Sequence, residues 1–331
     1  MTTTAYAPGR VNLIGDHTDY SGGLVLPIAI DLGTTVSGEP GGDDVRLRSE
    51  SQPLPAVVPL DVSEPTRLQP EWAHYVGGVV ARLRPAHGFR GTVRSTLPSG
   101  GGLSSSAALE VALALALGAD LEPLALARLC MEAEHLAGTR CGIMDQLASA
   151  AGVEGHALLI DCAALTIEPV PIPDGLQVVI VDSGVAHRNN EGEYTLRRTQ
   201  CEQAAALIGP LHLARPGDEA VLADPLLRQR ARHVVTENER VRAFVAALRS
   251  RDVAAVGPIM AASHASLRGD FGVSVDAVDD LVDRLAAAPG VHGARMTGGG
   301  FGGYVVALCD PGALDGHGRV VSASAGARRL P

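Results

Sequence analysis

Four consecutive polar residues follow an apolar stretch near the start of the chain. In the segment GRVNLIGDHTDY, strand-like residues 10–14 end at Gly15, and Asp16, His17, Thr18 and Asp19 come next. Two carboxylates, an imidazole and a hydroxyl place many hydrogen-bond acceptors and donors in one short loop. Loops positioned by a rigid strand often carry binding residues. The four residues are therefore candidates for a ligand site.

A second candidate is the segment LPSGGGLSSSAALEVALALAL at 97–117, in which three glycines separate the end of a strand from an apolar helix. Glycines let backbone amides approach a phosphate closely, and the first turn of a helix carries partial positive charge. A plain serine-capped helix is the alternative, but a structural cap needs at most one glycine. The segment thus favours an anion-binding loop, although it lacks the G-K-[ST] of a Walker A sequence.

Two further segments contain polar or glycine-rich motifs. Asp145 lies in TRCGIMDQLAS at 139–149, where a lone carboxylate is more often a helix cap or a surface residue. The segment MTGGGFGGYVVAL at 296–308 contains G-x-G-x-x-G from Gly298 to Gly303, but strand-like residues follow it. A dinucleotide site needs a helix there, so we expect a tight turn between two strands, with its backbone amides available to a ligand.

The composition excludes several classes of protein. The sequence of 331 residues has 27 arginines and no lysine. Walker A enzymes, protein kinases and Schiff-base enzymes need a lysine, so these classes are excluded. The net charge of -10, without a basic stripe, argues against a nucleic-acid partner. Five scattered cysteines, and the lack of a signal peptide or a long apolar segment, predict a cytoplasmic protein without a membrane partner.

Apolar periodicity predicts mixed helices and strands. Helices are expected at 71–84, 104–117 and 123–137 and over most of the chain after 191, with strands at 10–14, 24–36, 45–48, 91–97, 157–160, 166–170, 178–181, 293–296 and 304–308. The charged segment 227–244 is interpreted as a solvated helix face. A turn-rich link near residue 175 divides the chain into domains of residues 1–175 and 176–331.

In this order, the segments GRVNLIGDHTDYSGG, LPSGGGLSSSAALEVA, CGIMDQ and MTGGGFGG closely resemble those of the galactokinases within the GHMP small-molecule kinases. The resemblance implies a two-domain α+β fold, with an N-terminal ribosomal-protein-S5-domain-2-like domain and a C-terminal ferredoxin-like domain. It also implies transfer of the γ-phosphoryl group of MgATP to the C1 hydroxyl of galactose by a monomer. The alternatives are a kinase of a related sugar, such as arabinose, galacturonate or N-acetylgalactosamine, and a non-catalytic sensor of sugar and ATP.

The same resemblance implies a role for each motif. Asp145 is expected to be the catalytic base and Arg10 to stabilise charge on the nucleophile and the transferring phosphoryl group. Ser106 and Glu134 are the implied Mg²⁺ ligands, with Glu132 in reserve. The sugar ligands are expected to be Asp16, His17, Thr18, Asp19, Gly142 and Tyr194, and the ATP phosphates are expected to lie against Gly100, Gly101, Gly102, Leu103, Ser104, Ser105 and Ser106.

The sequence departs from the galactokinase pattern in three places. Asp16 stands where these kinases usually have glutamate, which leaves the identity of the sugar open. The interval from Glu134 to Asp145 is one residue shorter than usual, which is why Glu132 is the reserve ligand. The chain is also short for the family, and we expect the missing length in surface loops such as residues 39–70.

Overall fold

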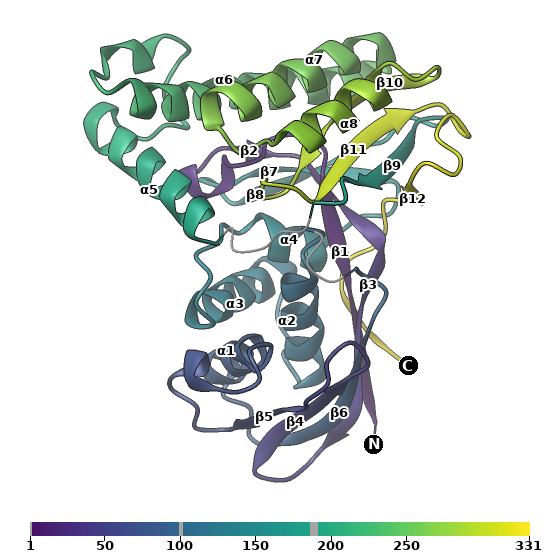
Figure 1. Cartoon of the computed structure of the whole chain (residues 1–331). Coiled ribbons are helices and arrows are strands. Elements are labelled where there is room, and N and C mark those ends of the chain that lie inside the picture. Colours follow the sequence, from purple (N-terminus) through teal and green to yellow (C-terminus); the bar gives the residue numbers. More distant parts are fainter. Residues whose placement is uncertain (1, 99–101, 186–190) are drawn as a thin grey trace.

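A computed structural model of the chain describes residues 2–98, 102–185 and 191–331 (Figure 1). One half is built on a six-stranded sheet in the order β13-β1-β3-β6-β4-β5. Its strands are β1 (Thr3–Asn12), β3 (Pro27–Pro40), β4 (Asp44–Ser49), β5 (Ala56–Pro59), β6 (Phe89–Ser95) and β13 (Arg328–Leu330). Neighbours in this sheet are antiparallel except β4 and β6, which are parallel. The last residues of the chain thus return to pair with the first strand.

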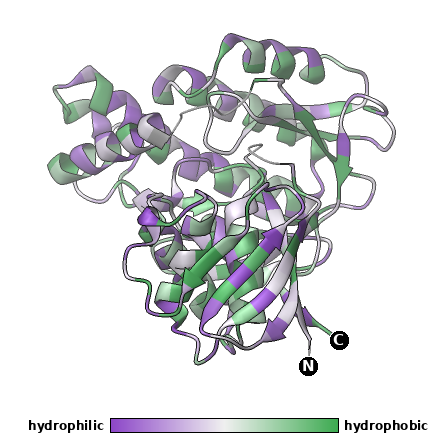
Figure 2. Cartoon of the chain, turned by 60° about the horizontal axis from the view of Figure 1, so that its bottom comes forward, coloured by the Kyte–Doolittle hydropathy of each residue, from purple (hydrophilic) through white to green (hydrophobic). Residues whose placement is uncertain are grey.

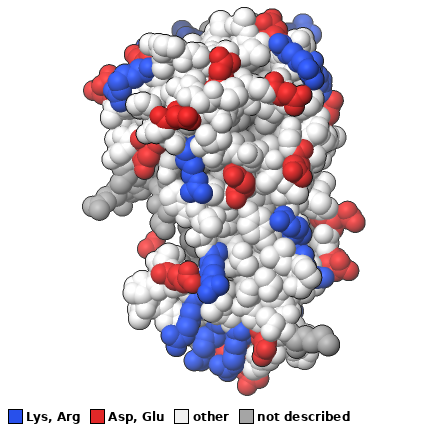
Figure 3. All heavy atoms as spheres, turned by 90° about the vertical axis from the view of Figure 1, so that its right-hand side faces the viewer, with Lys and Arg blue, Asp and Glu red and all other residues white. Residues whose placement is uncertain are grey.

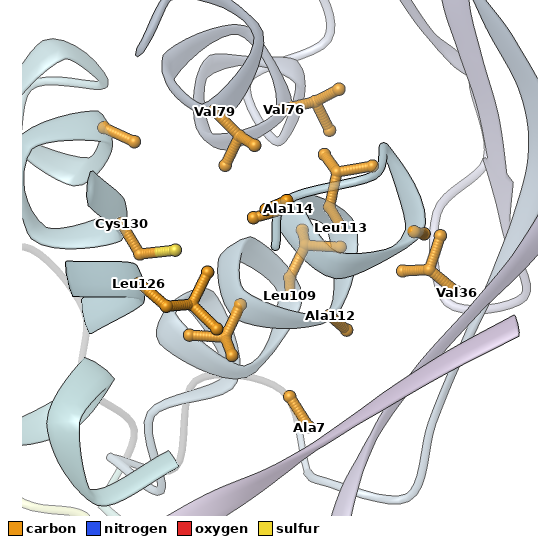
Figure 4. Close-up of a cluster of buried hydrophobic side chains, with 14 of the residues drawn as sticks. Ala7, Val36, Val76, Val79, Leu109, Ala112, Leu113, Ala114, Leu126 and Cys130 are labelled. Atoms are coloured by element: carbon orange, nitrogen blue, oxygen red, sulfur yellow. The ribbon is translucent and has the colours of Figure 1, made fainter. Parts of the chain in front are cut away.

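Four helices accompany this sheet: α1 (Ala73–Leu83), α2 (Ser105–Ala116), α3 (Pro123–Leu136) and α4 (Met144–Ala151). Helix α2 packs against β1 and β3, and α1, α3 and α4 surround it. Nine of its twelve residues are buried, because its sequence is apolar on all sides. Figure 4 shows its side chains meeting Val76 and Val79 from α1 and Leu126 and Cys130 from α3. The apolar run behind the glycines therefore forms the core of this half.

The other half has a four-stranded antiparallel sheet in the order β10-β11-β9-β12. Its elements are β9 (Gln177–Asp182), β10 (Val291–Thr297), β11 (Tyr304–Cys309), β12 (Arg319–Val321), α5 (Glu191–Ile208), α6 (Pro225–Ser250), α7 (Val253–Ser266) and α8 (Asp276–Ala286). Helices α7 and α8 pack on β10, and α6 packs on α5 and α7. In Figure 1, α6 and α7 lie at the top of the molecule and α5 lies at its left.

A three-stranded sheet, β2-β7-β8, completes the fold with β2 (Leu24–Val25), β7 (His156–Asp161) and β8 (Thr166–Pro171). Short turns of helix lie at Asp19–Ser21, Pro65–Arg67, Asp218–Val221 and Leu267–Phe271. Helix α6 contacts β2 and β8, so the middle sheet borders both halves. None of the helices within the described ranges is both long and apolar enough to cross a membrane.

Most predicted elements are present, and the differences have physical reasons. The first strand starts at Thr3 and ends at Asn12, because the threonine-rich start pairs with β3, whereas Leu13 and Ile14 form a turn bonded to Leu26. Residues 39–70 include β4 and β5, so this stretch is partly sheet and not simply loop. Strands of the larger sheet alternate between hydrophobic and hydrophilic residues in Figure 2, as one-sided burial requires. Acidic and basic side chains are mixed on the face in Figure 3.

Candidate active site

A pocket of about 280 Å³ brings together residues from three of the four sequence motifs, the first, third and fourth. The first motif supplies residues at the end of β1, the third supplies the start of α4, and the loop between β10 and β11 closes one side. Its described lining is Arg10, Asp16, His17, Asp19, Glu134, Gly138, Thr139, Arg140, Cys141, Gly142, Met144, Asp145, Tyr194, Thr195, Gly298, Gly299 and Gly300. Eight of the predicted site residues are among them. Sequence reasoning missed Thr139, Arg140 and Thr195, which no motif distinguishes.

Arg10 and Asp145 form a bidentate ion pair at the pocket. The Arg10 Nε donates to Asp145 Oδ1 at 2.8 Å and Nη2 donates to Oδ2 at 2.6 Å. Ser104 Oγ donates to the same Oδ2 at 2.5 Å, and Arg10 Nη1 donates to the Gly102 carbonyl at 2.6 Å. Ser104 has a positive φ of 58° and does not cap α2 with its side chain. The strand, the glycine loop and α4 are therefore tied together at one carboxylate.

Glu134 and Ser106 lie next to this pair. Ser106 Oγ donates to Glu134 Oε1 at 2.8 Å, while Cys141 Sγ donates to Oε2 at 3.1 Å and Gln146 Nε2 also donates to Oε2. Gln146 additionally reaches Glu110 Oε2 at 3.3 Å. Burial raises the pKa values of both Glu110 and Glu134. The adjacent oxygens of Ser106 and Glu134 are hard donors and fit one edge of a Mg²⁺ shell, to which a nucleotide and water would add the rest.

Glu132, the reserve metal ligand, lies away from Ser106 and Glu134. Glu132 pairs with Arg82 on the surface, and its side chain is 44% exposed. It does not line the pocket. Among the described residues, there is also no cluster of three or more His, Cys, Asp or Glu side chains suited to hold a metal. A cation here would therefore depend on a bound nucleotide for most of its ligands.

Asp19 and Gly142 are in close contact. A Cβ atom placed on Gly142 would lie 2.0 Å from Asp19 Oδ2, so the carboxylate rests directly on the glycine backbone. Burial, followed by the negative charge of Asp145, raises the pKa of Asp19 to about 6. Asp19 is therefore ionised at neutral pH and becomes protonated in mildly acidic solution.

His17 and Tyr194 form an aromatic wall beside Asp19. The rings of His17 and Tyr194 are 5.5 Å apart, and both contact Tyr20. His17 Nδ1 lies 3.1 Å from the Tyr20 hydroxyl, and burial lowers the pKa of His17 to about 3. The imidazole is therefore neutral and able to offer a hydrogen bond without adding charge.

The carboxylate of Asp16 faces protein groups on both oxygens. Oδ1 accepts from the Gly298 amide at 2.9 Å, and Oδ2 lies 2.7 Å from Nη2 of Arg295. Asp16 is 1% exposed and Arg295 is 0% exposed. Thr18 also turns inward, with its hydroxyl 2.8 Å from the Gly15 carbonyl and 2.7 Å from that of Leu24, and does not line the pocket. Of the four polar residues in the first motif, His17 and Asp19 are thus the most available to a ligand.

The prediction that segment 227–244 forms a solvated face is wrong for one side of α6. Arg230, His233, Glu237 and Asn238 are buried, and the last three bind residues within or directly after the first motif. The Gly15 amide donates to Glu237 at 3.1 Å and the Leu24 amide donates to Asn238 at 2.8 Å. The available signal was spacing: these residues share a helical stripe with Val234, Val241 and Leu248, which are buried.

The glycine-rich segments are placed as follows. Gly100 and Gly101 lie outside the described residues, whereas Gly102, Leu103 and Ser104 lead into α2. Ser105 is exposed and does not line the pocket. Gly298 to Gly303 connect antiparallel strands β10 and β11, which confirms a strand-to-strand turn in place of a dinucleotide site. A Cβ atom on Gly298 would lie 3.3 Å from the Gly102 carbonyl, so the two glycine loops are neighbours.

Comparisons with known proteins agree with this arrangement. Residues 2–40 match the model of the galactokinase galactose-binding signature, and residues 74–153 and 244–319 match those of the N-terminal and C-terminal GHMP kinase domains. A galactokinase of Chloroflexus aggregans is 45% identical over 95% of this chain and 85% of its own length. The human galactokinase is 45% identical over 93% of this chain and 83% of its own length.

Solved structures give the same result for the fold. A Lactococcus lactis galactokinase complexed with galactose has a TM-score of 0.90 and 29% identity, covering 99% of this chain and 95% of its own. A mevalonate kinase with 18% identity has a TM-score of 0.66 and covers 95% of this chain and 93% of its own, which supports the fold alone. The two-domain α+β fold of the GHMP kinases is thereby confirmed. The chain belongs to the galactokinase family of the GHMP kinases.

Proposed function

We propose that the protein transfers the γ-phosphoryl group of ATP to the C1 hydroxyl of galactose. The observation that carries this proposal is the Arg10–Asp145 ion pair, which lies between the polar loop of the first motif and the glycine loop before α2. A sugar on one side and a nucleotide on the other would meet at this pair. The names of the relatives and of the galactose-bound neighbour support galactose as the acceptor.

Asp145 is the proposed base. Its carboxylate would accept or orient the proton of the attacking hydroxyl, and Arg10 and Ser104 fix its position by three hydrogen bonds. Arg10 is also placed to stabilise negative charge that develops on the transferring group, because its guanidinium spans Asp145 and the Gly102 carbonyl of the glycine loop. Positioning and charge stabilisation are the main contributions that phosphoryl transfer requires from a protein.

The proposed sugar contacts are Asp19, His17, Gly142 and Tyr194, all of which line the pocket. The ionised Asp19 accepts hydrogen bonds from hydroxyl groups, the neutral His17 completes the polar wall, and Tyr194 packs beside both. Gly142 leaves the space in which the Asp19 carboxylate lies. Asp16 lines the same wall.

The proposed nucleotide side is the turn from Gly102 to Ser106 at the start of α2. Free backbone amides and the partial positive charge of a twelve-residue helix suit phosphate groups. Ser106 and Glu134 are the proposed residues for Mg²⁺, which would bridge and neutralise phosphate oxygens when bound. We also propose that the protein works in the cytoplasm, since its five cysteines, all within the described residues, are free thiols.

The test is sugar-dependent release of ADP with MgATP, measured across galactose, arabinose, galacturonate, N-acetylgalactosamine and glucose. We expect turnover with galactose to exceed that with every other sugar. If another sugar is turned over and galactose is not, that sugar is the acceptor and the protein is still a sugar kinase. If no sugar is turned over although galactose binds by calorimetry, the protein is a sensor and the proposed activity is wrong.

A further inference from the structure

Arg295, on β10, is a fully buried cation beside the first motif. Its Nη1 donates to the Leu13 carbonyl at 3.0 Å, and its Nη2 lies 2.7 Å from Asp16 Oδ2 and 3.8 Å from Glu237 Oε1. Both acidic partners are buried too. A buried charge costs free energy unless it is paired, so loss of one member of this cluster would leave another buried charge without its partner.

Side chains of this cluster and its neighbour His233 bind the backbone on both sides of the Asp16 side chain. Glu237 accepts from the Gly15 amide at 3.1 Å, and His233 Nε2 lies 3.0 Å from the Asp16 carbonyl. Further along β10, Thr297 Oγ1 donates to the Asn12 carbonyl at 2.8 Å. Side chains of α6 and β10 therefore fix the course of the chain from the end of β1 into the polar loop.

Asp16 connects this cluster to the proposed nucleotide side of the pocket. Its Oδ1 accepts from the Gly298 amide, and Gly298 lies against the Gly102 carbonyl, to which Arg10 also donates. One chain of contacts thus leads from Arg295 through Asp16 and Gly298 to the glycine loop. Oδ2 lies within ion-pair distance of Arg295 but accepts no hydrogen bond from the described residues. Because Oδ1 already accepts from Gly298 and Oδ2 is paired with a buried cation, Asp16 can act through position without binding the sugar itself.

We propose that Arg295 is a positioning residue that acts through Asp16 to assemble the sugar loop and the two glycine loops together. The proposal rests on the proposed function and adds to it a residue outside the pocket lining. On this proposal, the short side chain of Asp16 serves to form the ion pair with Arg295. The proposal also implies that loss of this pair weakens the nucleotide side as well as the sugar side.

The test uses Asp16→Asn, which keeps the shape and an acceptor for Gly298, and Arg295→Lys, which keeps the charge but not the forked geometry. Each variant is expected to raise the KM values for galactose and for MgATP by about tenfold, a typical size for losing a partner that orients a site. The double variant should be no worse than the poorer single one, because both changes break the same connection.

The matched control is Arg240→Met. Arg240 donates to Glu237 Oε2 at 2.6 Å from the other side and does not bond to Asp16. Both KM values should stay within about twofold of the parent in this variant, since Arg240 takes no part in the contacts that run from Arg295 through Asp16 to Gly298. Equal losses in Arg240→Met and Arg295→Lys would mean that the ion cluster matters only for folding and would overturn the proposal.

Calorimetry with MgADP alone separates this proposal from the galactose assignment. Weaker MgADP binding by folded Asp16→Asn supports the connection even if the parent enzyme turns over no galactose. Unchanged MgADP binding, with a rise in the galactose KM alone and effects that multiply in the double variant, would make Asp16 a direct sugar ligand. If thermal melting shows that Arg295→Lys does not fold, the Asp16→Asn titration decides alone.

Discussion

The polar loop on the proposed sugar side and the carboxylates on the proposed phosphate side of the pocket are held in different ways. The loop around Asp16 is held from behind, by buried side chains of α6 and β10 that bind its backbone. On the proposed phosphate side, Asp145 is held by two other proposed site residues, Arg10 and Ser104. Glu134 is held by Ser106, which is also a proposed site residue, and by Cys141 and Gln146. We therefore expect the sugar wall to be formed before a ligand arrives, and the hydrogen bonds among Arg10, Ser104, Ser106 and the two carboxylates to be exchanged when a nucleotide binds.

The largest effect is expected for Asp145→Asn, which removes the base while keeping the shape of the side chain. The value of kcat should fall by about a thousandfold, within the usual range for losing a general base. Galactose should still bind, as calorimetry can measure, because the sugar wall does not depend on Asp145. A kcat within tenfold of the parent would remove Asp145 from the role of base.

Glu134→Gln tests the exchange of hydrogen bonds on the phosphate side. The Mg²⁺ concentration that gives half-maximal activity should rise by about ten- to a hundredfold, since a carboxylate ligand is lost. Its matched control is Glu132→Gln, at the surface residue that pairs with Arg82. Mg²⁺ binding to the nucleotide-loaded protein, followed by calorimetry, should change in the first variant alone. A larger change in the Glu132 variant would restore that residue as the ligand.

Gly142→Ala tests how firmly the sugar wall is formed. The added methyl group would overlap Asp19 Oδ2, and rotation of the carboxylate should raise the galactose KM about tenfold while the protein still folds. The KM for MgATP should stay unchanged. Gly269→Ala is the control, because no atom lies within 4 Å of the added methyl group there. Equal behaviour of the two variants would show that Gly142 does not shape the sugar site.

A smaller effect is expected from pH. With a pKa of about 6, Asp19 is mostly ionised at pH 7.5 and mostly protonated at pH 5.5, so galactose should bind about fourfold more weakly at the lower pH. Calorimetry at both pH values measures this change. An affinity that does not vary over this range would show that ionised Asp19 is not a sugar ligand.

The raised pKa of Asp19 also affects the stability of the protein, and this effect is a control for the pH prediction. The pKa of Asp19 is higher in the folded protein than the usual value of about 4, so the folded state takes up a proton first and stability falls as pH rises from about 4 to 6. Asp19→Asn should therefore melt at a higher temperature than the parent at pH 7.5 and lose this advantage near pH 4. A lower melting temperature at pH 7.5 would contradict the shift.

Local sequence patterns were sufficient to predict much of the fold. The apolar run after the three glycines predicts α2, and the residues after Gly303 predict a strand that excludes a dinucleotide site. The return of Arg328–Leu330 to pair with β1 was not predictable, because three residues carry too little periodicity. The division at residue 175 stays a prediction.

The candidate site was less accessible to sequence reasoning. Motif residues identify the lining, but the bond between Arg10 and Asp145 joins positions 135 residues apart and follows from the tertiary fold alone. The burial of His233 and Glu237 was missed because charged helix residues are usually solvated, and here a cation from another strand pairs with the carboxylate. The resemblance implied that Asp16 binds the sugar, and only the structure shows that its carboxylate also lies against the Gly298 amide and Arg295.

The most direct test of the account is phosphorus NMR of the product formed from galactose and MgATP. We predict a single new phosphomonoester whose phosphorus couples to the proton on C1, and its complete absence in the Asp145→Asn variant over the same time. A phosphoryl group on any other carbon, or the same product from the variant at the parent rate, would contradict the proposed reaction.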